Sequence, residues 1–91
     1  MSKMRAWTGD KLEKAWARWR LYILKTQGEP MSLKLGESVA AYTSDPDERE
    51  ELAVMSFVHQ TMFDQSKTLE ELAVVTVDVN DNIKADFRMP E

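Results

Sequence analysis

Apolar residues recur at three- and four-residue intervals in the first third of the chain, which is the spacing of an amphipathic helix. At about 100° per residue they lie within roughly 60° of one another and form a stripe that should face the core. The stripe consists of Leu12, Trp16, Trp19 and Ile23. Thr8 stands where an N-cap belongs and Gly28 follows the last turn. The pattern therefore predicts a helix over residues 9–27, after a tail of residues 1–7.

Two further helices are predicted in the middle of the chain. Residues 33–42 carry a short and less regular apolar pattern, which favours a short helix. A longer helix over residues 46–65 has a clear start, with Asp45 as N-cap, Pro46 at the first helical position and Glu48 at the reciprocal position of a capping box.

The apolar positions of the 46–65 segment cover more than one face of the predicted helix. Its main face has Val58 at the margin and comprises Leu52, Met55, His59, Met62 and Phe63. Val54 and Phe57 lie outside this face, so the middle of the helix is apolar nearly all round. Either this is the central helix of the core, or a second chain covers its second face, and we expect a homodimer.

The period changes to two in the last quarter of the chain. Residues 74–79 are rich in β-branched side chains, and Asn80–Asn82 tolerate the left-handed geometry of a tight turn. The returning segment alternates, with Ile83, Ala85, Phe87 and Met89 expected to point inward. This pattern predicts a β-hairpin over residues 73–89 that rests on the helices. A second box-like start, from Thr68 to Glu71, precedes the hairpin. The whole chain, residues 1–91, is thus expected to be a single small α+β domain, with three helices followed by a C-terminal β-hairpin.

Composition narrows the class of protein. A hydrophobic fraction of 43% beside 31% charged residues is typical of a folded globular domain. No apolar run approaches the roughly 18 to 20 residues that cross a bilayer, and the amino terminus lacks the apolar stretch of a signal peptide. Cysteine is absent, which fits a reducing compartment. We expect a cytoplasmic protein that does not contact membranes.

Charge is divided unevenly along the chain. Residues 1–36 carry eight Lys/Arg against three Asp/Glu, a net charge of +5, whereas residues 37–91 carry four against thirteen, a net charge of −9. Such asymmetry indicates either attraction between the two halves, within the fold or across a homodimer, or a basic face that meets an anionic partner. We favour the first interpretation.

The 9–27 helix also carries a basic face beside its aromatic residues. Lys11, Lys14, Arg18, Tyr22 and Lys25 fall within roughly 80° of one another, with Trp7 and Arg20 close by in the sequence. Cations neutralise phosphates and an exposed aromatic ring can stack on a base, so this face suits nucleic acid. The predicted partner-binding residues are Trp7, Lys11, Lys14, Arg18, Arg20, Tyr22 and Lys25.

No residue pattern predicts an enzyme, a cofactor or a metal site. The single histidine, His59, is expected to be a packed, hydrogen-bonded core residue. The acidic run at 45–51 suits helix capping. The Asp78–Asn82 segment begins like a calcium loop, but Ile83 stands where the required glycine belongs and Met89 where the bidentate Glu belongs, so we expect a turn.

These observations predict a non-enzymatic protein-interaction module, with no catalytic residues, no cofactor and no metal. A phage or plasmid accessory protein that binds a host or partner protein fits this description. The alternative is a nucleic-acid-binding protein that uses the basic face of the first helix.

Overall fold

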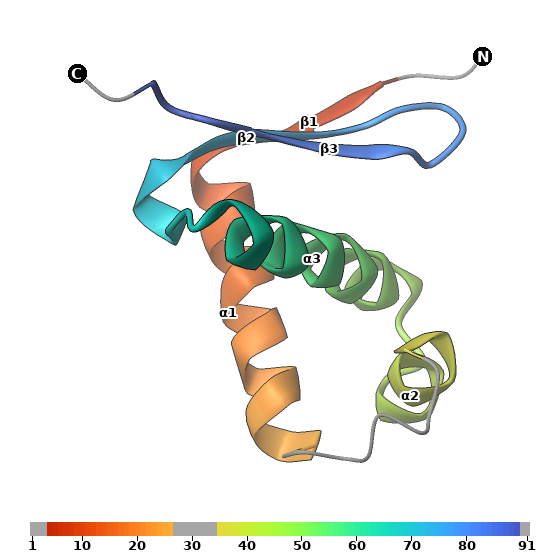
Figure 1. The fold of residues 1–91 in the computed structure, drawn as a ribbon. Coiled ribbons are helices and arrows are strands. Elements are labelled where there is room, and N and C mark those ends of the chain that lie inside the picture. Colours follow the sequence, from red (N-terminus) through yellow and green to blue (C-terminus); the bar gives the residue numbers. More distant parts are fainter. Residues whose placement is uncertain (1–3, 27–34, 90–91) are drawn as a thin grey trace.

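The computed structural model describes residues 4–26 and 35–89, which form three α-helices and a three-stranded sheet (Figure 1). In chain order the elements are β1 (Arg5–Trp7), α1 (Gly9–Thr26), α2 (Leu35–Tyr42), α3 (Pro46–Gln65), the short 3-10 helix η1 (Leu69–Glu71), β2 (Leu72–Val77) and β3 (Ile83–Phe87). The predicted α+β class, with three helices and a C-terminal strand pair, is confirmed. The predicted helix ends at residues 27 and 33 lie outside the described residues.

The sheet is antiparallel in the order β1-β2-β3, and β1 was not predicted. Residues 1–7 are expected from the sequence to be a tail, but Arg5–Trp7 pair with Val75–Val77 of β2. Three residues are too few to show a period of two, and their partner strand is remote in the sequence, so no local pattern reveals β1.

Helices α1 and α3 lie against one face of the sheet (Figure 1). Helix α3 contacts β3, and α1 contacts β2 and α3. The strand register places Trp7, Val75 and Ala85 in one cross-strand row. Trp7 and Val75 are buried, so this row faces the helices. The alternate row, from Ala6 to Lys84, points to the open face.

The start and end of α3 follow from local hydrogen bonds. Asp45 is the N-cap, as predicted, and its Oδ1 accepts a hydrogen bond from the Asp47 backbone N–H at 2.9 Å. The backbone N–H of Asp45 donates to the Thr43 hydroxyl at 3.2 Å, whereas a capping box would direct it to Glu48. Ser66 ends the helix in the left-handed conformation with φ of 55°. The second box is confirmed, because Glu71 Oε1 accepts the Thr68 backbone N–H at 2.9 Å.

The buried face of α1 is rotated from the predicted stripe. It comprises Leu12, Ala15, Trp19 and Tyr22. Trp16 is only half-buried and Ile23 is 38% exposed, so the prediction for Ile23 is wrong. Tyr22 is drawn inward because Trp19 stacks on it, with ring centroids 5.4 Å apart, and Tyr42 of α2 meets it edge-on at 5.1 Å. The position of α2 beside α1 cannot be predicted from the periodicity of α1.

Because α3 contacts α1, α2 and the sheet, its buried arc is wide. Its buried residues are Glu51, Leu52, Val54, Met55, Val58 and Met62. The prediction of a central core helix therefore holds for Val54. It fails for Phe63 and His59, which are exposed, and in the hairpin it fails for Met89, which lies beyond β3 and is 85% exposed.

Candidate functional site

Two members of the predicted basic face are tied to α3. Lys11 Nζ lies 2.7 Å from Glu51 Oε2, and the Arg18 guanidinium bonds to Glu51 Oε1. The Glu51 side chain is only 3% exposed, whereas those of Lys11 and Arg18 are 43% and 37% exposed. Glu51 is thus a buried carboxylate that α1 neutralises with two cations, which supports the intramolecular interpretation of the charge asymmetry.

The protonation of this cluster follows from competing effects. Burial raises the pKa of the Glu51 carboxyl, but hydrogen bonds from Lys11 and Arg18 together outweigh burial and leave the pKa below its usual range. The hydrogen bond to Glu51 also raises the pKa of Arg18. Glu51 and Arg18 are therefore both charged at neutral pH.

The remaining predicted cations differ in where they lie relative to this pair. Lys14, Arg20 and Lys25 are exposed, and within residues 4–26 and 35–89 they make no salt bridge. Arg20 lies roughly 160° around α1 from Arg18, on the opposite side of the helix. Lys14 lines a hollow together with Lys11 and Arg18, but three carboxylates also line it, so its surroundings are of mixed charge.

The two aromatic residues predicted to bind a partner belong to the core. Trp7 is 4% exposed and lies under the Lys11 ammonium, which is 4.7 Å from the ring centroid. Tyr22 is 6% exposed and its hydroxyl is hydrogen-bonded to the Ser38 hydroxyl. Neither ring is available to a partner in this structure, because packing with α2, α3 and the sheet consumes its surface, so we remove both from the candidate site.

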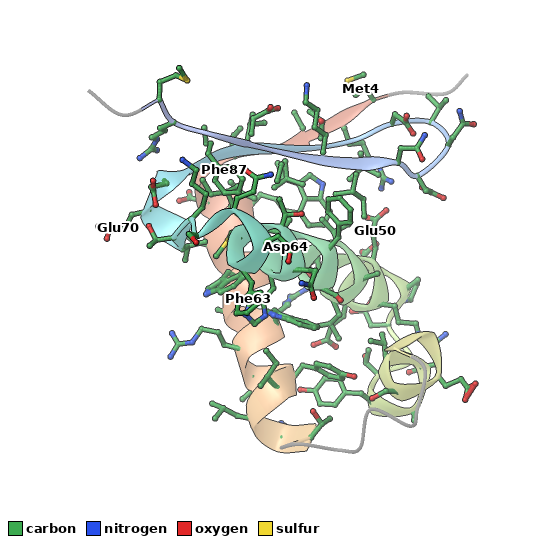
Figure 2. The ribbon with its side chains drawn as sticks, in the orientation of Figure 1. Met4, Glu50, Phe63, Asp64, Glu70 and Phe87 are labelled. Atoms are coloured by element: carbon green, nitrogen blue, oxygen red, sulfur yellow. The ribbon has the colours of Figure 1, made fainter. Side chains whose placement is uncertain are left out.

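An aromatic surface lies instead along one side of the α1–α3 contact. We define the α1–α3 aromatic surface as Trp16 and Ile23 of α1 with His59 and Phe63 of α3. Phe63 is 78% exposed and lies on the side of α3 that faces α1 (Figure 2). Beside it is a hollow of about 200 Å³, lined by Trp19, Ser56, His59, Gln60 and Phe63. The sequence pattern predicted that Phe63 is in the core, because its helical phase matches that of Leu52. In the structure the α1–α3 contact ends before it covers the Phe63 side chain.

His59 is held in place within this surface. Its Nδ1 accepts a hydrogen bond from Trp19 Nε1 at 3.0 Å, and its ring meets the Trp16 ring edge-on, with centroids 5.5 Å apart. The predicted hydrogen bond is present, but His59 is exposed rather than buried. The imidazole thus orients two tryptophans at the rim of the hollow.

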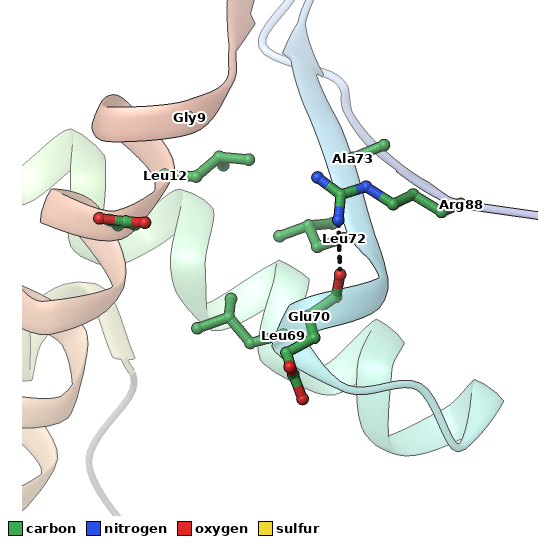
Figure 3. A pocket seen from close by; sticks show the side chains of 8 residues that line it. Gly9, Leu12, Leu69, Glu70, Leu72, Ala73 and Arg88 are labelled. Atoms are coloured by element: carbon green, nitrogen blue, oxygen red, sulfur yellow. Dashed lines mark hydrogen bonds between the residues drawn. The ribbon is translucent and has the colours of Figure 1, made fainter.

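A further hollow, of about 250 Å³, opens where α1 begins beside η1 and the start of β2 (Figure 3). Leu12, Leu69 and Leu72 line it, and Arg88 lies at its edge with Nη1 donating to the Glu70 carbonyl at 3.1 Å. Glu13 also lines this hollow. Its walls are mainly aliphatic, and the one guanidinium is already hydrogen-bonded to the backbone, so it has the chemistry of a small apolar contact.

Several acidic residues of the described part of the chain have structural partners. Glu50 pairs with Arg5 of β1, and Asp78 Oδ1 accepts the backbone N–H groups of Asn80 and Asn82, each at 2.8 Å. The bonds from Asn82 are the main reason that the pKa of Asp78 is lowered. The Asp78–Asn82 segment is therefore a turn, as predicted. Within residues 4–26 and 35–89, no three His, Asp or Glu side chains converge as metal ligands would.

The arrangement defines a small α+β domain in which two helices cover one face of a three-stranded antiparallel sheet. No protein family, curated protein or solved structure was found to match this chain. Among the described helices, none is both long and apolar enough to cross a membrane.

Proposed function

We propose that this chain is a non-enzymatic protein-interaction module that binds a partner protein through the α1–α3 aromatic surface. The observation that carries the proposal is Phe63, a large aromatic side chain that is 78% exposed and lines a hollow with Trp19 and His59. Aromatic residues are enriched among those that dominate binding energy at interfaces, and they pack best around a shallow pocket. The hollow beside Phe63 supplies such a pocket.

The charges around this surface support a protein partner over a nucleic acid. Arg20 is an exposed cation on the same side of α1 as Ile23, roughly 60° away, and arginine is common at protein interfaces. The nucleic-acid alternative loses Lys11 and Arg18, because both neutralise Glu51. The three other predicted cations alone would release few counterions and bind phosphate weakly. A cytoplasmic location and a phage or plasmid origin remain predictions from the sequence alone.

The experiment that tests this function is affinity capture with matched surface variants. Tagged wild-type protein, Phe63→Ser and Met89→Ser would each be incubated with native lysate, with and without nuclease treatment. Each incubation is run at about 50 and 300 mM salt, a span over which phosphate-driven binding collapses. Met89 is a suitable control because it is equally apolar and 85% exposed, but lies after β3, outside the α1–α3 aromatic surface. We expect a discrete protein that the wild type and Met89→Ser retain and Phe63→Ser loses.

Two results would contradict the proposal. Identical capture by all three variants would place the binding elsewhere. Capture that disappears with nuclease or at the higher salt would favour the nucleic-acid alternative. Circular dichroism of each variant confirms that the fold is retained, which is expected because both substitutions replace exposed side chains.

A further inference from the structure

Strand β3 is an edge of the sheet, and its backbone polar groups divide into two sets. At one end, the Asn82 carbonyl accepts the Asp78 backbone N–H at 3.0 Å, and at the other end the Arg88 backbone N–H donates to the Glu71 carbonyl at 2.6 Å. Hydrogen-bonding direction alternates along an antiparallel strand, so the even-numbered residues point their backbone groups at β2. The N–H and C=O groups of Ile83, Ala85 and Phe87 therefore point outward, away from β2.

The side chains of β3 are arranged symmetrically about its central residue. The five residues read Ile-Lys-Ala-Asp-Phe, with Ala85 in the middle. Lys84 and Asp86 lie on the open face of the sheet, and within the chain their charged atoms are 3.7 Å apart. Ile83 and Phe87 lie on the face that packs against the helices. A second β3, placed antiparallel with Ala85 opposite Ala85, would set Lys84 against Asp86 and Ile83 against Phe87.

We propose that two copies of this chain associate through their β3 strands, which pair antiparallel about Ala85 into one continuous six-stranded sheet. In this register the outward backbone groups of Ile83, Ala85 and Phe87 meet those of the second copy's Phe87, Ala85 and Ile83, so all of them are paired. Lys84 and the second copy's Asp86 then occupy a non-hydrogen-bonded position, where opposing side chains are closest. Edge strands are commonly protected by charge, but here the charges are self-complementary.

Strand pairing by itself gives a small interface, and α3 adds apolar area beside it. Because α3 packs under β3 and α1 under β2, the side of α3 that faces away from α1 lies along the β3 edge. Phe57 is on that side, roughly 160° around the helix from the midpoint of Glu51 and His59, the residues that contact α1. It is 44% exposed. A two-fold axis perpendicular to the sheet keeps both sets of helices on one face, so the two Phe57 side chains approach each other across it.

This inference does not depend on the proposed function, because it concerns a different surface and a different partner. It also agrees with the sequence-based expectation of a homodimer, which came from the apolar positions around most of α3.

The test is a charge exchange read by sedimentation equilibrium of the full chain. We expect the wild type to sediment at twice the 10.5 kDa mass of the chain at high concentration and to dissociate on dilution. Lys84→Glu and Asp86→Lys each place like charges at two symmetric contacts. Each should raise the dissociation constant of the dimer by about tenfold to a hundredfold. The double exchange, Lys84→Glu with Asp86→Lys, restores opposite charges across the axis and should return the constant to within about threefold of wild type.

Ala85→Pro provides a second variant that acts on the backbone. It removes an outward N–H and leaves the β2–β3 hydrogen bonds in place, so the monomer should still fold, as circular dichroism would show, while the dimer is lost. Phe63→Ser should stay dimeric, which separates this surface from the proposed partner site. A wild type that is monomeric at every concentration overturns the proposal. So does a dimer that neither the single exchanges nor Ala85→Pro weakens.

Discussion

Removing charges from the Lys11–Glu51–Arg18 cluster should cost very different amounts depending on which member is removed. In a Lys11→Met, Arg18→Met double variant, Glu51 remains at 3% side-chain exposure with no cation beside it. Breaking a buried ion pair from one side typically costs about 3 to 5 kcal/mol, because an uncompensated charge stays buried. For a domain whose total stability is about 5 to 15 kcal/mol, this is a large fraction of the free energy of unfolding.

The reverse change should be milder. In Glu51→Gln the two cations lose their partner, but both side chains are more than one third exposed and water can solvate them. The loss is then a hydrogen bond to a charged group, partly offset by the lower cost of burying an amide, about 1 to 2 kcal/mol in all. Adding Glu51→Leu to the double variant should recover most of the lost stability, because apolar residues can replace a buried ion pair.

The assay is urea unfolding followed by fluorescence of the three tryptophans, with the free energies compared in a mutant cycle. The double variant should also regain stability as the pH falls, because burial without cations raises the pKa of Glu51 in the folded state. If removing both cations costs less than Glu51→Gln, or if Glu51→Leu does not rescue the double variant, then the carboxylate is not desolvated and the reasoning fails.

Three further outcomes are expected from the same unfolding measurements. In the wild type, ionised Glu51 stabilises the fold above its ordinary pKa near 4.5, and this stabilisation is lost as the pH falls through the lower pKa of the folded state. Glu51→Gln should therefore show a shallower fall in the free energy of unfolding below about pH 5. Equal slopes for the two proteins would contradict this. Asp45→Ala removes the α3 N-cap and should cost about 1 kcal/mol, whereas Ser44→Ala, next to it, should be neutral, and similar losses from both would argue against a cap. Substitutions at the two left-handed positions should change stability in opposite directions. Ser66→Gly relieves a φ of 55° and should stabilise the fold by up to about 1 kcal/mol, whereas Gly9→Ala places a side chain at a φ of 47° and should destabilise it by about 1 kcal/mol or more. Destabilisation by Ser66→Gly would show that the backbone at Ser66 is not strained.

Local signals in the sequence predicted most of the fold. Asp45 and Pro46 mark the start of α3, the 9–26 periodicity marks α1, and the change of period after Leu72 marks the hairpin, because each of these depends on residues that are neighbours in the chain. The α1 stripe was predicted about 40° away from its true position. Tyr22 packs against Tyr42, and no pattern within α1 shows on which side α2 will lie.

The candidate site was less predictable for the same reason. Lys11 and Arg18 look like a free basic face until Glu51, more than thirty residues later, is placed between them. Phe63 has the helical phase of a core residue, and its exposure depends on where the α1–α3 contact ends. Both features depend on tertiary contacts. The sequence of either helix alone predicts a free basic face and a buried Phe63 instead.

The pairing of β1 with β2 also bears on the order in which the chain folds. Arg5 lies opposite Val77, 72 positions further along, so β1 leaves the ribosome well before its partner strand. Closing a loop of that length costs chain entropy, which contacts made elsewhere must offset. We therefore expect β1 to attach after α1 and α3 have packed. During that interval the inner edge of the β2–β3 hairpin has no neighbour, and a chain stalled or cut before β1 attaches would present it for exchange between molecules.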